Sequence, residues 1–276
     1  MEVWFTERQT DAVTIGLKVK AVLWRERTPY QELAVVESEA YGRVLILDGA
    51  IQTTERDEYV YHEMIAQVPL AVHPHPRRVA VIGGGDGGAI REILRHPAVE
   101  EAHLIEIDER VVEVAQRFFP EIAIGLNDDR THLHFTDGIA WAREARDFDV
   151  ILVDSTDPVG PAEGLFTAEF YKTLYEALGP DGIMVAQSES PFLQPDLLRR
   201  VVQGVREHFP VTRVYLASVP TYPSGLWSFT WGSKRHEPED LRELEAPWRA
   251  HLRYWTPEVH RAAFALPPFV KELVDG

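Results

Sequence analysis

Acidic residues stand at the ends of predicted strands in the middle of the chain, where side chains of many α/β proteins contact ligands. They are Asp86 in a glycine-rich turn, Glu106 in "IEID", Asp137 in "TDG", and Asp154 and Asp157 in "VDSTDP". In an open parallel sheet the carboxyl ends of the strands meet at one edge, and the ligand binds there. The sequence therefore predicts one crevice lined by several carboxylates.

The glycine-rich turn lies in "VIGGGDGGAIREIL", residues 81–94. Gly83, Gly85 and Gly88 fit G-x-G-x-x-G between a strand and a helix, and Glu106 follows about 20 residues on, where an acid hydrogen-bonds ribose hydroxyls. A pyrophosphate beside Asp86 would place two anions together at a cost of several kcal/mol. The turn therefore disfavours NAD and FAD and favours a cationic nucleoside, such as an S-adenosyl sulfonium. Asp137 and Gly138 suit its adenine.

Two kinds of segment must position these side chains. Residues 1–55 contain β-rich runs separated by Pro or Gly turns, which predict antiparallel hairpins. From residue 77 onward strands alternate with helices, which predicts a doubly wound parallel sheet covered on both faces. We therefore expect an α/β protein with a small N-terminal β-domain, residues 1–55, and a Rossmann-like catalytic domain, residues 56–276.

Composition excludes several classes of function. The 276 residues carry a net charge of −16, which argues against binding to nucleic acids or to anionic membranes. The absence of cysteine excludes disulfides and thiol catalysis. No signal peptide or spanning apolar run is found, so we expect a soluble, cytoplasmic protein. The histidine pairs in "HPHPRR" and "THLHF" lack a carboxylate or third ligand at recognisable spacing, so no metal site is predicted.

Several motifs in order resemble the spermidine synthases, the polyamine aminopropyltransferases. These motifs are "YHEM", "IGGGDGG", "IEID", "DSTDPVGPAEGLF" and "PTYPSGLW", and the resemblance runs from "WFTE" to "AFALP". It implies a Rossmann-like domain of the methyltransferase type and a homodimer or homotetramer. The implied reaction transfers the aminopropyl group of decarboxylated S-adenosylmethionine, a co-substrate, to putrescine, giving spermidine and methylthioadenosine. No prosthetic group is implied.

The resemblance also implies roles for single residues. Those implied to bind the nucleoside are Gln31, Glu106, Asp137, Gly138 and Pro161, in addition to the turn glycines Gly83 and Gly85. Those implied to line the amine site are His62, Asp86, Asp154, Asp157 and Tyr222, with Tyr61 beside them. Asp154 is the implied proton acceptor. The partner of the far ammonium of a diamine is left open, and residues 157–166 are a candidate lid.

Three alternatives stay open at this point. The acceptor amine is one of several, among them agmatine, cadaverine, 1,3-diaminopropane and spermidine, because pocket length decides between them. An S-adenosylmethionine-dependent methyltransferase would share the fold, but Asp86 would repel the carboxylate of that co-substrate. A catalytically silent polyamine- or nucleoside-binding protein is disfavoured by the intact acids Glu106, Asp137 and Asp154.

Overall fold

The computed structural model describes residues 2–156, 160–242, 248 and 250–276. Its N-terminal part is a five-stranded antiparallel sheet with the strands in sequence order. The strands are β1 (Val3–Arg8), β2 (Thr14–Arg27), β3 (Glu32–Ser38), β4 (Gly42–Leu47) and β5 (Ala50–Thr54). This sheet lies within the predicted segment 1–55. The division of the chain at residue 55 stays a prediction.

The second sheet has seven strands in the order β11-β12-β10-β9-β6-β7-β8. They are β6 (Arg78–Gly83), β7 (Glu101–Glu106), β8 (Thr131–Phe135), β9 (Phe148–Asp154), β10 (Leu178–Gln187), β11 (Val211–Ser218) and β12 (Leu226–Ser233). Strands β6 to β10 are parallel, as predicted. Strand β12 is antiparallel to both of its neighbours, β10 and β11. Only residues 219–225 join β11 to β12, which is too short for the crossover that a parallel pair needs.

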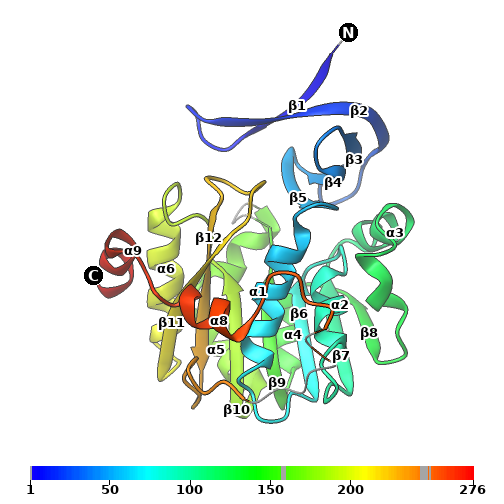
Figure 1. Cartoon of the computed structure of the whole chain (residues 1–276). Helices are drawn as coiled ribbons and strands as arrows, with labels where there is room; N and C mark the ends of the chain where they lie inside the picture. Colours follow the sequence, from blue (N-terminus) through cyan, green and yellow to red (C-terminus); the bar gives the residue numbers. More distant parts are fainter. Residues whose placement is uncertain (1, 157–159, 243–247, 249) are drawn as a thin grey trace.

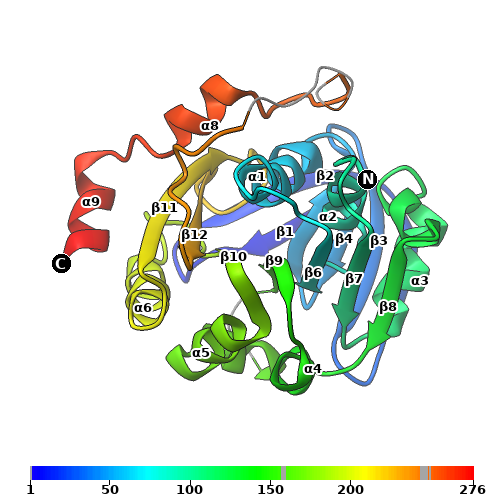
Figure 2. The same ribbon diagram turned by 90° about the horizontal axis from the view of Figure 1, so that it is seen from below.

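Helices cover both faces of the second sheet (Figure 2). Helices α1 (Glu58–Leu70), α2 (Gly88–Leu94) and α8 (Pro257–Ala263) cover one face, and α4 (Gly138–Glu144), α5 (Ala168–Ala177) and α6 (Pro195–Arg206) cover the other. Helix α9 (Pro268–Asp275) packs against α6. The predicted α/β class, with a doubly wound sheet of the methyltransferase type and an N-terminal antiparallel sheet, is confirmed.

The N-terminal sheet lies across the end of the seven-stranded sheet at which β6, β7 and β9 terminate (Figure 1). Strands β3 and β4 reach α3 (Glu109–Phe118) and the segment before the 3-10 helix η1 (Ala123–Asn127). The buried side chains that join them are Leu33, Val35, Leu45, Leu47, Val111, Val114, Phe119 and Ile122. This apolar contact fixes the N-terminal sheet over the carboxyl ends of the strands. No helix in the described part of the chain is long and apolar enough to cross a membrane.

Candidate active site

A pocket lies where the N-terminal sheet meets the carboxyl ends of β6, β7, β9 and β10. The acids among its lining residues are Glu7, Asp48, Asp86, Glu106, Asp137, Asp154 and Glu189, and no lysine or arginine is found among the described lining residues. A cleft lined by one sign of charge concentrates ligands of the opposite sign. The pocket therefore suits a cationic ligand, as the sequence predicts.

Two glycines of the turn lie in close contact with neighbouring elements. Gly83 has a φ of +84°, which L side chains rarely adopt, and a Cβ there would overlap the carbonyl of Asp154. A Cβ at Gly88, at the start of α2, would overlap the imidazole of His62. These two glycines let β9 and α1 approach the turn closely.

Asp86 is held in a fixed orientation by two partners. Its Oδ1 accepts a hydrogen bond of 2.9 Å from the backbone N–H of Gly88, and its Oδ2 lies 3.3 Å from Nε2 of His62. On the other side of the ring, Nδ1 of His62 lies 2.6 Å from Oε2 of Glu58. Burial lowers the pKa of His62, but the two carboxylates outweigh it and hold that pKa well above its ordinary value. A carboxylate beside each ring nitrogen therefore favours the protonated form of His62, the imidazolium.

Asp154, the last residue of β9, accepts a hydrogen bond of 2.6 Å from the hydroxyl of Tyr61 to its Oδ1. Burial raises the pKa of Asp154 to about 6, with Asp86 adding to the rise, while His62 and the Tyr61 hydroxyl oppose it. An ordinary aspartate pKa near 4 is badly matched to accepting a proton at neutral pH. The raised value brings Asp154 closer to that task.

Aromatic side chains form a wall beside Asp154. The rings of Tyr61 and Tyr222 lie 5.4 Å apart, and those of Tyr222 and Trp227 lie 4.7 Å apart. The hydroxyl of Tyr222 donates a 2.6 Å hydrogen bond to the carbonyl of Gln52, so the wall is tied to β5. Such a wall can pack against an alkyl chain and attract an ammonium over its ring faces.

The residues predicted to bind the nucleoside lie at the ends of β7 and β8. Glu106 accepts a 2.9 Å hydrogen bond from the backbone N–H of Asp108, and burial raises the pKa of Glu106 to about 7 in spite of such bonds. Asp137 caps α4 through one oxygen, which accepts a 2.7 Å hydrogen bond from the backbone N–H of Ile139. Gly138 lines the pocket next to it.

Gln31 reaches the same region from the loop before β3. Its amide Nε2 donates a 2.9 Å hydrogen bond to Oδ2 of Asp108, the residue that caps α3. This bond links the loop before β3 to the N-terminus of α3.

The structure brings most of the predicted site residues together. The pocket is lined by Gln31, Tyr61, His62, Gly83, Gly85, Asp86, Glu106, Asp137, Gly138, Asp154 and Tyr222. Asp157 lies outside the described residues, as do Pro158 and Val159 of the candidate lid. Pro161 falls in the 3-10 helix η2 (Gly160–Phe166).

Sequence reasoning missed Gln187 and Glu189 at the end of β10. Both line the pocket, and Glu189 is buried with a φ of +63°, an uncommon and costly conformation for a non-glycine residue. The amide Nε2 of Gln187 donates a 3.1 Å hydrogen bond to the carbonyl of Ser155. The rule that located the other acids, an acid just after a strand, would have found Glu189 in "VAQSES".

Comparison with known proteins settles the family. Residues 58–241 match the spermine/spermidine synthase domain, and residues 3–55 match the spermidine synthase tetramerisation domain. The chain belongs to the spermine/spermidine synthase family. The prediction that it is a polyamine aminopropyltransferase is confirmed.

Relatives from several bacteria match over nearly their whole length. The polyamine aminopropyltransferase of Moorella thermoacetica is 54% identical, over 99% of this chain and 97% of its own. That of Caldicellulosiruptor saccharolyticus is 52% identical, over 100% of this chain and 99% of its own.

Two solved structures are similar to this one over almost the whole chain. A spermidine synthase in complex with the transition state analogue AdoDATO has a TM-score of 0.96 and 40% identity, over 99% of this chain and 95% of its own. The spermidine synthase from Thermotoga maritima has a TM-score of 0.95 and 39% identity, over 99% of this chain and 94% of its own.

Proposed function

We propose that this aminopropyltransferase uses decarboxylated S-adenosylmethionine and putrescine, and releases spermidine and methylthioadenosine. The observation that carries the proposal is a pair of acids, the buried Asp86 in the glycine turn and the half-buried Asp154 at the end of β9, in a cleft whose described lining holds no lysine or arginine. The co-substrate brings a sulfonium and an ammonium into this cleft, and the acceptor brings two amines.

Three acids suit the three parts of the co-substrate. Glu106 accepts hydrogen bonds from ribose hydroxyls, and Asp137, whose Oδ1 caps α4, offers its other oxygen to the adenine amino group. Asp86 pairs with the ammonium of the aminopropyl group. S-adenosylmethionine carries a carboxylate beside this ammonium, and Asp86 would repel it. A similar spermidine synthase was solved in complex with the transition state analogue AdoDATO, which supports aminopropyl transfer as the reaction.

The transfer is a displacement at the methylene carbon bonded to the sulfonium. The neutral nitrogen of the diamine attacks this carbon, a C–N bond forms, and the C–S bond breaks with its electron pair going to sulfur. Methylthioadenosine leaves as a neutral thioether. The new ammonium gives its proton to Asp154, which Tyr61 holds in place. Positioning of the two substrates supplies most of the rate, because the thioether is already a good leaving group.

The far ammonium of the diamine is assigned to Glu189. Glu189 lines the same pocket from the end of β10, the strand next to β9 that carries Asp154. Tyr222 and Trp227 pack along the alkyl chain between the two ends. A slot with an acid at each end and aromatic walls favours a diamine over a monoamine.

We also propose a homotetramer assembled through the N-terminal sheet. Residues 3–55 match the tetramerisation domain, and Val3, Trp4 and Val22 on this sheet are each more than half exposed. These exposed apolar side chains lie on β1 and β2, the first two strands of the matched segment. Sedimentation equilibrium of the full chain gives its mass directly, and a monomer would contradict the proposal.

An amine competition assay tests the proposed substrate. The enzyme is given decarboxylated S-adenosylmethionine with equal amounts of putrescine, agmatine, cadaverine, 1,3-diaminopropane and spermidine, and the amine products and methylthioadenosine are quantified. We expect spermidine formed from putrescine to dominate. A different dominant product would reassign the acceptor but leave aminopropyl transfer in place, whereas no methylthioadenosine with any amine would overturn the proposed reaction.

A further inference from the structure

A group of histidines lies on β7 and β8, away from the active site. His103 of β7 is the register partner of His132 of β8. Glu101 lies two residues before His103 on β7, and His134 lies two residues after His132 on β8. Side chains two apart on a strand share a face of the sheet. The sequence shows only the pair in "THLHF", and the register adds the carboxylate and the third histidine that this pair lacks.

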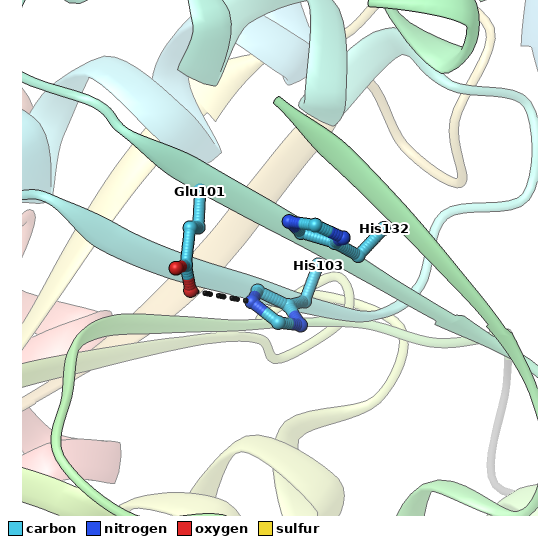
Figure 3. A group of neighbouring side chains, drawn as sticks. All are labelled: Glu101, His103 and His132. Carbon is cyan, nitrogen blue, oxygen red and sulfur yellow. Dashed lines mark hydrogen bonds and ion pairs between the residues drawn. The ribbon is translucent and has the colours of Figure 1, made fainter. Parts of the chain in front are cut away.

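The spacing of these groups matches a metal site. One ligand atom from each of Glu101, His103 and His132 lies within 4.8 Å of the other two. Nε2 of His103 lies 3.2 Å from Oε2 of Glu101, as Figure 3 shows. Ligand atoms around a tetrahedral Zn²⁺ are about 3.4 Å apart, given bonds of about 2.0–2.2 Å. The exposed side chain of His132 has the freedom to close the remaining gap.

A fourth side chain orients the central ligand. Nδ1 of His103 lies 3.0 Å from Nε2 of His134, and the two rings are stacked at 5.2 Å. A histidine that binds a metal through one ring nitrogen usually donates a hydrogen bond from the other, which fixes its tautomer and orientation. His134 can accept this bond, which leaves Nε2 of His103 to face Glu101.

We propose that Glu101, His103 and His132 bind a divalent transition metal ion of the Zn²⁺ type, with His134 as the group that orients His103. Two imidazoles and one carboxylate favour Zn²⁺, Ni²⁺ or Cu²⁺ over Mg²⁺ or Ca²⁺, which prefer oxygen ligands. Water completes the coordination, because Glu101 is 42% exposed and His132 is exposed.

A neighbouring arginine competes with the ion for Glu101, and the ion would link two strands of the sheet. Nε of Arg78 lies 3.0 Å from Oε2 of Glu101, so the ion displaces this pair or uses the other carboxylate oxygen. Strand β8 is one of the two edge strands of the seven-stranded sheet. An ion held by residues of both β7 and β8 joins the edge strand to the sheet. Glu101 and Glu106 are five residues apart on β7, roughly 16 Å, so the ion is remote from the reaction.

Calorimetric titration of Zn²⁺ into the full chain, without an affinity tag and after removal of bound metal, tests the site. We expect one ion per chain. His103→Ala and His132→Ala should each weaken binding by about 100-fold, and His134→Ala by about 10-fold, since it removes only the orienting partner. His75→Ala is the matched control, because His75 is exposed and lies outside the cluster, and it should bind as the wild type does.

Stability gives a second readout. Zn²⁺ should raise the thermal midpoint of the wild type and of His75→Ala, but not that of the double variant His103→Ala/His132→Ala. His132→Gln, at an exposed position, replaces the alanine variants if these do not fold. The proposal is overturned if the wild type binds no Zn²⁺, or if the His103 and His132 variants bind it as tightly as the wild type does.

Discussion

Nε2 of His62 lies 3.3 Å from Oδ2 of Asp86, and this buried ion pair explains an acid in a glycine-rich turn. A lone buried carboxylate would be strongly destabilising, but here an imidazolium stands beside it. Glu58 lies on the other side of the ring and is paired in turn with Arg91 at 2.8 Å. Because Gly88 holds the second oxygen, Asp86 is oriented before any ligand arrives.

Asp154→Asn should lower kcat by at least about 100-fold, the low end for loss of a general base. Asparagine keeps the shape of the side chain and can still accept the hydrogen bond from Tyr61, but it takes no proton. Initial rates at saturating co-substrate and putrescine measure the effect, with Asp196→Asn on the exposed start of α6 as the control. Turnover near that of the wild type would remove Asp154 from its role.

The same substitution should stabilise the fold at high pH. Burial raises the pKa of Asp154 to about 6, so the native state binds this proton more tightly than the unfolded state does. Stability therefore falls as the pH rises from the ordinary aspartate pKa through about 6, and it stays reduced above that value. At pH 8 we expect Asp154→Asn to raise the free energy of unfolding by about 1–3 kcal/mol. At pH 4 the gain should vanish. Denaturant unfolding at both pH values measures it, and equal effects at both would be inconsistent with a raised pKa.

The logarithm of kcat/KM should rise with pH from 6 to about 8.5, because an alkyl amine has a pKa near 10.4 and only its neutral form attacks. Below about pH 6 the rise should be steeper, since Asp154 is then protonated as well. Initial rates at low putrescine concentration give the profile. A flat profile, under conditions in which the chemical step limits the rate, would argue against amine deprotonation.

Glu189→Gln should raise KM for putrescine with little change in the dissociation constant of the co-substrate. The substitution removes one charge from the far end of the slot and leaves the nucleoside side unchanged. We expect a rise of at least about tenfold, the effect of losing one charged hydrogen bond of 1.5–3 kcal/mol. Steady-state kinetics in putrescine and calorimetry of the co-substrate separate the two effects. Equal weakening of both ligands would point to a disturbed backbone at this left-handed residue instead.

Sequence reasoning located the acids that follow strands directly. Asp86, Glu106, Asp137 and Asp154 lie at or just beyond strand ends, and the alternation of strands and helices places such ends together. The antiparallel direction of β12 follows from the short segment before it, a signal that the alternation alone does not carry.

Other features depend on register or on helix packing. The contact between His62 and Asp86 requires α1 to cross the start of α2 at Gly88, which no local spacing reveals. The cluster around His103 requires the pairing of β7 with β8, and residues 101 and 132 are too far apart in sequence to suggest it.

The pairing of Asp86 with the aminopropyl ammonium is the central claim, and Asp86→Asn tests it most directly. Asparagine can keep the hydrogen bond from Gly88, so the turn should hold its shape while the charge is lost. Calorimetry measures the affinities of the variant and the wild type for decarboxylated S-adenosylmethionine and for methylthioadenosine. We predict a loss of about 100-fold for the first, the size expected when one partner of a buried ion pair is removed, and little change for the second, which has no amine. An equal loss for both ligands would contradict the account and would mean that Asp86 only shapes the turn.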